Sequence, residues 1–143
     1  LQAISADTIL VHQKYKNKEE ILEKANRILL KKGCVEKEFF DSVKSRERMS
    51  STEIGNSIAI PHGSDKYVRE TAIVLITLEE PILWRDGMVS VVLYTAVSFE
   101  QKDTMKKLLK DLYHLISSED FIERIQKAAT VEEILGVFYG KGL

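Results

Sequence analysis

His62 is the residue of this sequence whose surroundings best suit chemistry. It follows the apolar run Ile58-Ala-Ile-Pro61 and precedes Gly63, so it lies where a short predicted strand ends at a rigid proline. A side chain at such a position is held by a buried strand and emerges at the rim of the sheet, where functional residues often lie. An imidazole there can act as a nucleophile. The alternative is a histidine that only caps a turn, and the residue types alone favour neither interpretation.

Short polar side chains and two arginines precede His62 in the sequence. Gly55 permits a tight turn close to a ligand, and the polar side chains near it can donate hydrogen bonds. Arg46 or Arg48 can supply a guanidinium, which together with such donors would stabilise a phosphoryl group. The alternative for the arginine cluster is an ordinary solvated helix end. The candidate donors are Ser51, Thr52, Asn56 and Ser57.

The other two histidines and the single cysteine have simpler interpretations. His12 is interpreted as a strand-end residue without a role, His114 as a solvated residue off the apolar stripe of its helix, and Cys34 as a small packed side chain. The sequence contains no phosphate-binding loop, no dinucleotide-binding glycine pattern and no His-Glu-x-x-His pair. We therefore expect neither a metal nor an organic cofactor.

The spacing of apolar residues predicts the elements that position His62. Residues 71–78 and 89–97 are apolar on both faces, which is typical of central strands covered on both sides. Asn17 is placed to cap a helix and Gly33 to end it. Helices, then strands, then helices predict one α/β sandwich domain over residues 1–143. Further expected strands are 8–12 and 57–61, and further expected helices are 36–48, those after residue 100, and 130–138.

Composition excludes several classes of protein. The chain has 143 residues, of which 44% are hydrophobic and 30% charged, as in ordinary globular domains. A formal net charge of −1 argues against a nucleic-acid-binding surface, and one cysteine excludes an internal disulfide. No apolar run reaches the roughly 20 residues of a membrane span, and no signal peptide opens the chain. We expect a cytoplasmic domain without membrane insertion, and the first residue, Leu1, suggests a domain excised from a larger protein.

The stretch from Ser45 to Gly63 resembles the active-site signature of the fructose/mannitol-type (type 2) enzyme IIA domains. These domains belong to the bacterial phosphoenolpyruvate-dependent sugar phosphotransferase system. Arg-Glu, Ser-Thr, Ile-Gly and Ile-Pro-His elements occur together in this stretch, and the resemblance continues through residues 80–84 to residues 131–135. It implies a mixed β-sheet flanked by helices on both faces.

The resemblance also implies roles for two residues. His62 matches the histidine that accepts a phosphoryl group from the phosphocarrier protein HPr, at Nε2, and Arg46 matches the arginine that holds the phosphoryl oxygens. In transporters the group then passes to a IIB domain, and the family uses no metal or organic cofactor. Two positions depart from the family pattern. Ser57 stands where the signature usually has glycine, and residues 102–106 contain no histidine where transport-type members carry a second one.

The pattern of residues 107–116 is more similar to the IIA-like domains of certain transcription regulators, of the antiterminator and mannitol/lichenan activator kind. In those proteins, phosphorylation of the IIA-like domain signals sugar flux to a DNA- or RNA-binding domain elsewhere in the polypeptide. We therefore expect a regulatory phosphoacceptor domain. The alternatives are a transport enzyme IIA component that passes the phosphoryl group to a IIB domain, and a degenerate binding module without phosphotransfer.

Overall fold

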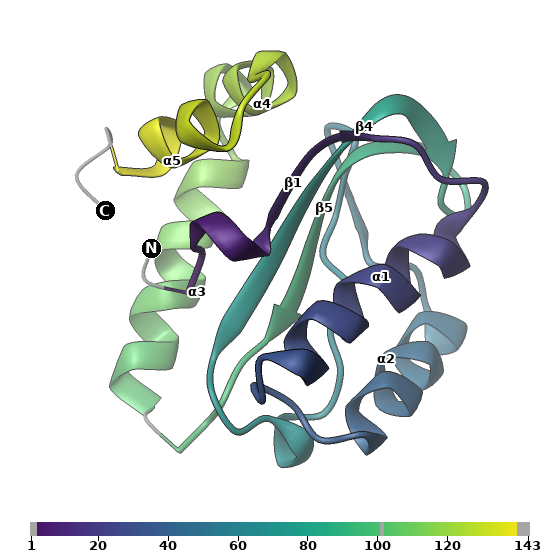
Figure 1. Cartoon of the computed structure of the whole chain (residues 1–143), viewed down its shortest axis with the longest axis vertical. Helices are drawn as coiled ribbons and strands as arrows, with labels where there is room; N and C mark the ends of the chain where they lie inside the picture. Colours follow the sequence, from purple (N-terminus) through teal and green to yellow (C-terminus); the bar gives the residue numbers. More distant parts are fainter. Residues whose placement is uncertain (1–2, 101, 140–143) are drawn as a thin grey trace.

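A five-stranded sheet divides the protein into two helical layers (Figure 1). The computed structural model describes residues 3–100 and 102–139. The strands are β1 (Ile9–Gln13), β2 (Glu53–Gly55), β3 (Ile58–Ala59), β4 (Ala72–Leu83) and β5 (Met88–Ala96). Their order in the sheet is β1-β4-β5-β3-β2, with β1–β4 and β3–β5 parallel and the other two pairs antiparallel. The mixed sheet of the expected α/β sandwich is therefore confirmed.

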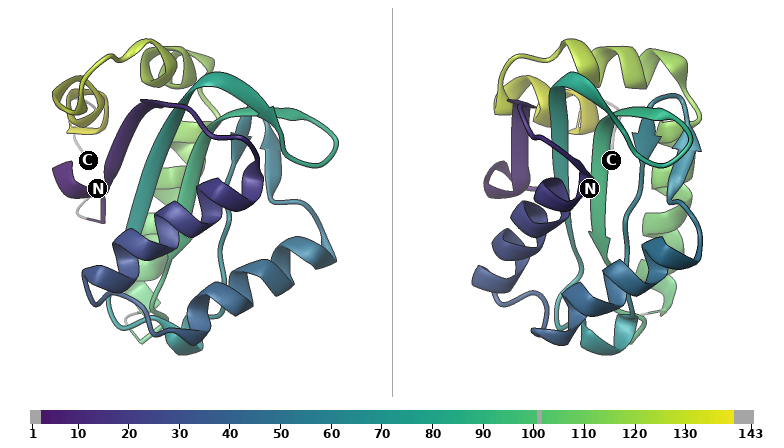
Figure 2. Two further views of the ribbon diagram at one scale, coloured as in Figure 1. Left: turned by 45° about the vertical axis from the view of Figure 1, so that its right-hand side comes forward. Right: turned by 90° about the vertical axis from the view of Figure 1, so that its right-hand side faces the viewer.

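Helices cover both faces of this sheet, as Figure 2 shows. The helices are α1 (Lys18–Lys31), α2 (Glu38–Met49), α3 (Lys102–Ile116), α4 (Glu119–Lys127) and α5 (Val131–Tyr139). Alternation along β4 builds the two cores, because Ile73 and Leu75 pack with α3, α4 and α5 while Val74 and Ile76 pack with α1 and α2. Within the described residues, no helix is both long and apolar enough to cross a lipid bilayer.

The ends of α1 follow the predicted local signals. The side chain of Asn17 accepts a hydrogen bond from the backbone N–H of Glu20 at 3.0 Å, which satisfies one of the free donors of the first turn. Gly33 follows the helix with a φ of 77°, a conformation that a residue without a side chain adopts readily. Both predicted helix boundaries are confirmed.

Strand β4 is longer than predicted. It continues past residue 78 to Leu83, because Ile82 pairs with Val89 and Leu83 pairs with Met88 across the hairpin. This second half is largely exposed and contains Pro81, so it lacks the two-sided apolar pattern that marks residues 71–78. The predicted strand therefore ends at residue 78, where the buried part of β4 ends, although the β4–β5 hairpin continues to Leu83.

The predicted strand 57–61 is shorter in the structure and has a partner that was not predicted. Only residues 58 and 59 form β3, and they pair with the short strand β2 across a two-residue turn. The turn residues Asn56 and Ser57 have φ values of 55° and 65°, as a tight hairpin turn requires at both central positions. Asparagine tolerates this left-handed conformation, whereas serine is strained in it. Glycine at position 57 would remove that strain.

We predict that Ser57→Gly stabilises the domain slightly. Relief of the left-handed strain, about 1 kcal/mol, is partly offset by the greater freedom of glycine in the unfolded chain, about 0.4–1 kcal/mol. The expected result is a small rise in melting temperature, on the order of 1–2 °C, measured by thermal denaturation. Ser57→Ala, which removes the hydroxyl and keeps the strained Cβ, is the control and should show no rise. A clear fall in stability of Ser57→Gly would contradict the explanation.

Candidate functional site

The backbone that leads into His62 is hydrogen-bonded on both sides. His62 forms a parallel β-bridge with Thr95 of β5, and the carbonyl of Pro61 accepts a hydrogen bond from the N–H of Thr95 at 2.8 Å. On the other side, the N–H of Ile60 donates to the carbonyl of Thr52 at 3.0 Å. Strand β3 ends at Ala59, before Pro61, and an isolated bridge at His62 continues the pairing with β5. His62 consequently emerges from a fixed backbone just after the short strand.

The imidazole of His62 has one ring nitrogen engaged. Its Nδ1 lies 2.9 Å from the carbonyl oxygen of Ile60. A carbonyl oxygen only accepts hydrogen bonds, so Nδ1 carries the proton in this contact. In the neutral ring the lone pair then belongs to Nε2, and the side chain is only half-buried. The contact therefore sets a tautomer in which Nε2 is the nucleophilic nitrogen.

The backbone that follows His62 is packed tightly against α2. The N–H of Ser64 donates to the hydroxyl oxygen of Ser42 at 2.9 Å, and the Ser42 hydroxyl donates to the carbonyl of Phe39 at 2.6 Å. A Cβ atom on Gly63 would lie 2.4 Å from Ser42 Oγ, which is closer than Cβ atoms approach other atoms, and 3.1 Å from Phe39 Cε1, which is tighter than most such contacts. Glycine at position 63 is therefore required for this approach of the chain to the helix.

Arg46 lies one turn after Ser42 on the same side of α2. Its Nη1 donates to the carbonyl of Ser50 at 2.7 Å and to the Ser50 hydroxyl at 3.0 Å. A guanidinium has five N–H donors, so further donors remain for an anionic ligand. Helix α2 thus carries both the predicted phosphoryl-binding cation and the side chain that contacts the backbone after His62.

The two hydroxyls before β2 are hydrogen-bonded to carboxylates. The Thr52 hydroxyl donates to Glu47, whose buried carboxylate also accepts a hydrogen bond from Lys18 Nζ at 3.1 Å. The Ser51 hydroxyl donates to Glu53 at 2.9 Å. Both candidate donors therefore hold the segment between α2 and β2 in place, next to the strand that ends at His62.

The tip of the β2–β3 hairpin lies away from His62. Ile58 pairs with Val91 and His62 pairs with Thr95. Val91 and Thr95 are four positions apart on β5, which corresponds to about 13 Å at 3.3 Å per residue. The expectation that the whole polar stretch surrounds the imidazole is thus met only in part, because the exposed tip is separated from the ring by this length of strand. The residues of the tip are Gly55, Asn56 and Ser57.

Glu53 joins this hairpin to the turn between β4 and β5. Its carboxylate accepts hydrogen bonds from the backbone N–H groups of Asp86 at 3.0 Å and Arg85 at 3.1 Å. The Asp86 N–H is the main cause that holds the pKa of Glu53 below its ordinary value, because these donors favour the charged form. The turn between β4 and β5 is therefore attached to β2 through one carboxylate.

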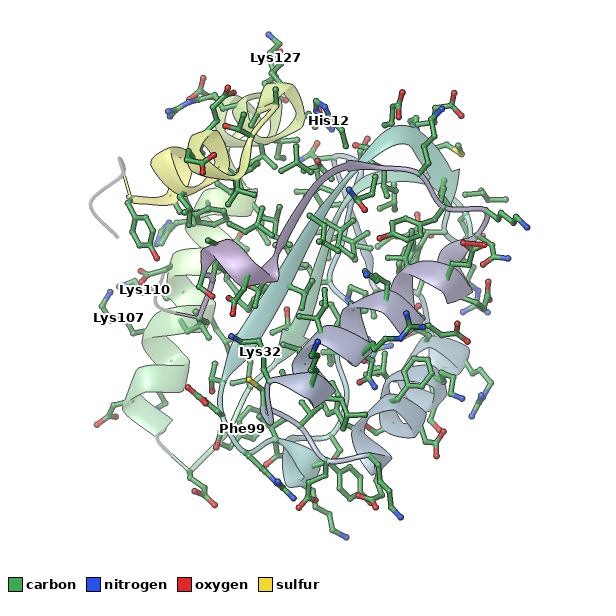
Figure 3. All side chains as sticks on the ribbon, viewed as in Figure 1. His12, Lys32, Phe99, Lys107, Lys110 and Lys127 are labelled. Atoms are coloured by element: carbon green, nitrogen blue, oxygen red, sulfur yellow. The ribbon has the colours of Figure 1, made fainter. Side chains whose placement is uncertain are left out.

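His12 lies far from His62 in the fold. Figure 3 shows His12 beside α4, close to Lys127, and Phe99 at the opposite end of the domain. His62 belongs to the end of Phe99, because it pairs with Thr95, four residues before Phe99. The Nε2 of His12 is 3.3 Å from the carbonyl of Gln126, near the C-terminal end of α4. His12 is therefore a strand-end residue that contacts a helix terminus and contributes nothing to the site of His62.

His114 and Cys34 also lie where the sequence predicts. His114 is exposed on α3, where its ring meets that of Tyr113 edge-on. Cys34 is a buried free cysteine, and burial raises the pKa of its thiol. A thiol kept protonated by its surroundings is a packing group rather than a nucleophile.

Two residues of the site were not predicted. Glu47 lies between the two arginines for which a solvated helix end is the alternative, yet its side chain is only 4% exposed. Ser42 was not singled out, although its spacing of four residues from Arg46 places both on one face of the helix. That helical spacing was the available signal for Ser42.

Comparison with known proteins identifies relatives over nearly the whole chain. Residues 2–140 match the family described as phosphoenolpyruvate-dependent sugar phosphotransferase system, EIIA 2. The transcriptional regulator ManR of Bacillus subtilis is 32% identical over 127 residues, which cover 89% of this chain but only 20% of the regulator. The mannitol-specific phosphotransferase enzyme IIA component of Geobacillus stearothermophilus is 31% identical over 137 residues, which cover 94% of this chain and 93% of that protein.

Solved structures share the fold. The complex of enzyme IIAMtl with phosphorylated enzyme IIBMtl from Escherichia coli contains a chain that superposes with a TM-score of 0.84 at 26% identity, covering 96% of this chain and 97% of that one. The crystal structure of IIA mannitol from Escherichia coli superposes with a TM-score of 0.81 at 27% identity, covering 94% of this chain and 98% of that one. The architecture described above is therefore that of known IIA structures.

We predict that Thr52→Val destabilises the domain by about 1–3 kcal/mol, because the buried Glu47 carboxylate loses a donor and stays away from water. Urea denaturation followed by circular dichroism measures the change. Thr52→Ser, which keeps the hydroxyl, is the matched control and should lose less. Equal stability of the valine and serine variants would show that the hydrogen bond is unimportant.

Proposed function

Because the chain belongs to the phosphoenolpyruvate-dependent sugar phosphotransferase system EIIA 2 family, we propose that it is a phosphocarrier domain whose acceptor is His62. The observation that carries this assignment is the contact of 2.9 Å between His62 Nδ1 and the Ile60 carbonyl, which leaves Nε2 as the nucleophile. The proposed donor is phospho-HPr, as the resemblance to this family implies. This donor makes the cytoplasm the proposed location.

The proposed step moves a phosphoryl group between two imidazoles. The Nε2 lone pair of His62 forms a bond to phosphorus while the bond from phosphorus to the HPr histidine breaks. The electron pair of the broken bond returns to the HPr ring, and each ring keeps the proton on its other nitrogen. No net proton transfer is needed, so the hydrogen bond to Ile60 is compatible with both states of His62.

Arg46 is the proposed cation for the phosphoryl oxygens. It lies on α2, the helix that contacts Ser64 and Gly63 just after the acceptor. Its bonds to Ser50 use Nη1 and leave other donors of the guanidinium free to bind oxygen. Charge-assisted hydrogen bonds from these donors would stabilise the negative charge that gathers on the phosphoryl group during transfer.

We further propose that the domain serves a sugar-responsive transcription regulator. Two observations support this proposal. Residues 102–106, at the start of α3, contain no histidine, and 89% of this chain resembles a segment of ManR. In such a protein the charge added to His62 would alter a contact with other domains of the same polypeptide. Nucleic acid would be bound by those other domains.

A transport enzyme IIA component is the second candidate. It is supported by the similarity to a mannitol-specific IIA component over 93% of that protein. In this case the phosphoryl group would pass from His62 to a IIB domain, and no second histidine of this chain would assist at the start of α3. The two candidates share the first step and differ in the second.

The first step is tested by labelling with phosphoenolpyruvate, enzyme I and HPr. We expect the wild-type protein to acquire an acid-labile phosphate and His62→Ala to acquire none. Arg46→Ala keeps the acceptor, so labelling should be about 10- to 100-fold slower because a charge-assisted hydrogen bond of about 1.5–3 kcal/mol is lost.

The controls for this experiment are His12→Ala and His114→Ala, which remove the other two histidines and should label like the wild type. Full labelling of His62→Ala would refute the acceptor. Absence of labelling in the wild type would favour the degenerate binding module, and retained binding of HPr would support that interpretation.

The second step is tested by chasing the labelled protein with IIB domains encoded near its gene. For a regulatory domain, we expect the phosphate to remain on His62, or to return only to HPr. Gel autoradiography of both proteins measures the transfer. Rapid loss of label to a IIB domain would contradict the regulatory proposal and establish the transport candidate.

A further inference from the structure

The two groups that must act together on a phosphoryl group come from different elements. The nucleophile lies at the end of β3, whereas Arg46 lies on α2. The strand side is fixed by hydrogen bonds to Thr52 and Thr95 before the histidine. A separate contact is therefore needed to hold α2 at a constant distance from the imidazole, because a misplacement of about 1 Å can slow a reaction 100-fold.

Ser42 makes this contact. Its hydroxyl oxygen accepts the N–H of Ser64 at 2.9 Å, and its proton is directed to the carbonyl of Phe39 at 2.6 Å. The bond to Phe39 fixes the rotation of the hydroxyl, so a lone pair is held toward Ser64. Ser42 is half-buried, and this hydrogen bond connects two elements that are 22 residues apart in sequence.

The packing around Gly63 shows that the turn after His62 lies directly against α2. Besides Ser42 Oγ at 2.4 Å, a Cβ on this residue would meet Val43 Cγ2 at 2.9 Å. The backbone next to His62 thus lies so close to α2 that no side chain fits between them at Gly63. The hydrogen bond from Ser64 to Ser42 joins the turn and the helix at this close contact and so opposes their sliding past each other.

We propose that Ser42 is a positioning residue for phosphoryl transfer: through Ser64 it fixes the turn after His62 on α2, and so fixes the spacing between His62 Nε2 and the Arg46 guanidinium. Ser42 does not touch the phosphoryl group. The inference rests on the proposed role of His62, and its experiments are chosen to be separable from that role.

Ser42→Ala tests this positioning role. We expect about tenfold slower labelling by phospho-HPr, with the Michaelis constant for phospho-HPr unchanged, because the Ser42 hydroxyl is engaged inside the domain by Phe39 and Ser64. The ¹⁵N chemical shifts of the His62 ring should move toward a mixture of tautomers as the turn loosens and the bond to Ile60 weakens. Ser45→Ala, an exposed serine on the same helix, is the control and should change neither measurement.

A second pair of variants alters the other partner of the hydrogen bond and leaves α2 intact. Ser64 has a φ of −74°, which proline also adopts, but the proline Cδ would take the place of the N–H that meets Ser42 Oγ at 2.9 Å, so Ser64→Pro removes the hydrogen bond and also pushes the turn away from α2. Ser64→Ala keeps the N–H and loses only the side chain that caps the next turn. We expect Ser64→Pro to be slowed about tenfold like Ser42→Ala, and Ser64→Ala to remain near the wild-type rate.

The outcomes separate this inference from the proposed function. If the wild type is labelled and both Ser42→Ala and Ser64→Pro retain its rate and ring signals, Ser42 has no positioning role, although His62 remains the acceptor. If the wild type is not labelled, the test depends on the ¹⁵N chemical shifts of the His62 ring alone. Shifts that are unchanged in both Ser42→Ala and Ser64→Pro would then overturn the positioning role. Slower labelling of Ser64→Ala to the same extent as Ser64→Pro would also overturn it.

Discussion

The buried carboxylate of Glu47 connects the elements that surround the candidate site. The side chain of Glu47 is 4% exposed and must be neutralised and hydrogen-bonded where it lies, because an unpaired charge away from water is strongly unfavourable. Lys18 supplies the opposite charge from α1, and Thr52 supplies a donor from the segment before β2. One carboxylate therefore joins two helices and the edge of the sheet. Arg46, its neighbour in sequence, takes its position from the same helix turn.

The hydrogen bond between Thr52 and Glu47 also helps to position His62. The side chain of Thr52 bonds to Glu47, and its carbonyl accepts the N–H of Ile60, whose own carbonyl then orients the imidazole. The first of these hydrogen bonds is buried, the second joins two backbone groups and the third is partly buried, so the ring is held by the framework of the fold rather than by exposed side chains. Such preorganisation means that little reorganisation is needed when charge arrives at Nε2.

The sequence predicted the layers well because burial leaves a clear pattern. The central strands β4 and β5 are apolar on both faces. His62 was correctly expected just after a short strand, although that strand ends at Ala59 rather than at Pro61. Strand β2 was missed because three partly exposed residues carry no such pattern, and their pairing depends on a turn that contains Ser57 where glycine is the usual signal.

The same hairpin explains why the supporting residues were only partly foreseen. Residues 55–57 are nearer to His62 in the sequence than Ser51 and Thr52 are. In an antiparallel hairpin the order in space is reversed, because the strand after the turn runs back beside the strand before it. The pairs Gly55–Ile58 and Glu53–Ala59, with a register shift between them, place Thr52 opposite Ile60, while the turn lies farther from His62. Sequence distance is a poor guide to neighbourhood wherever an unpredicted reversal of the chain intervenes.

The first and last described segments of the domain also meet. The hydroxyl of Tyr139, at the end of α5, donates to the carbonyl of Ile4 at 3.1 Å, and α5 packs against η1 (Ala6–Thr8) and β1. When the first and last segments of a domain are neighbours, the domain can be inserted into another polypeptide without disturbing its interior, because the flanking chain enters and leaves it at nearly the same place. The fold is accordingly suited to modular reuse in the course of evolution, as a separate protein or as one link in a longer chain.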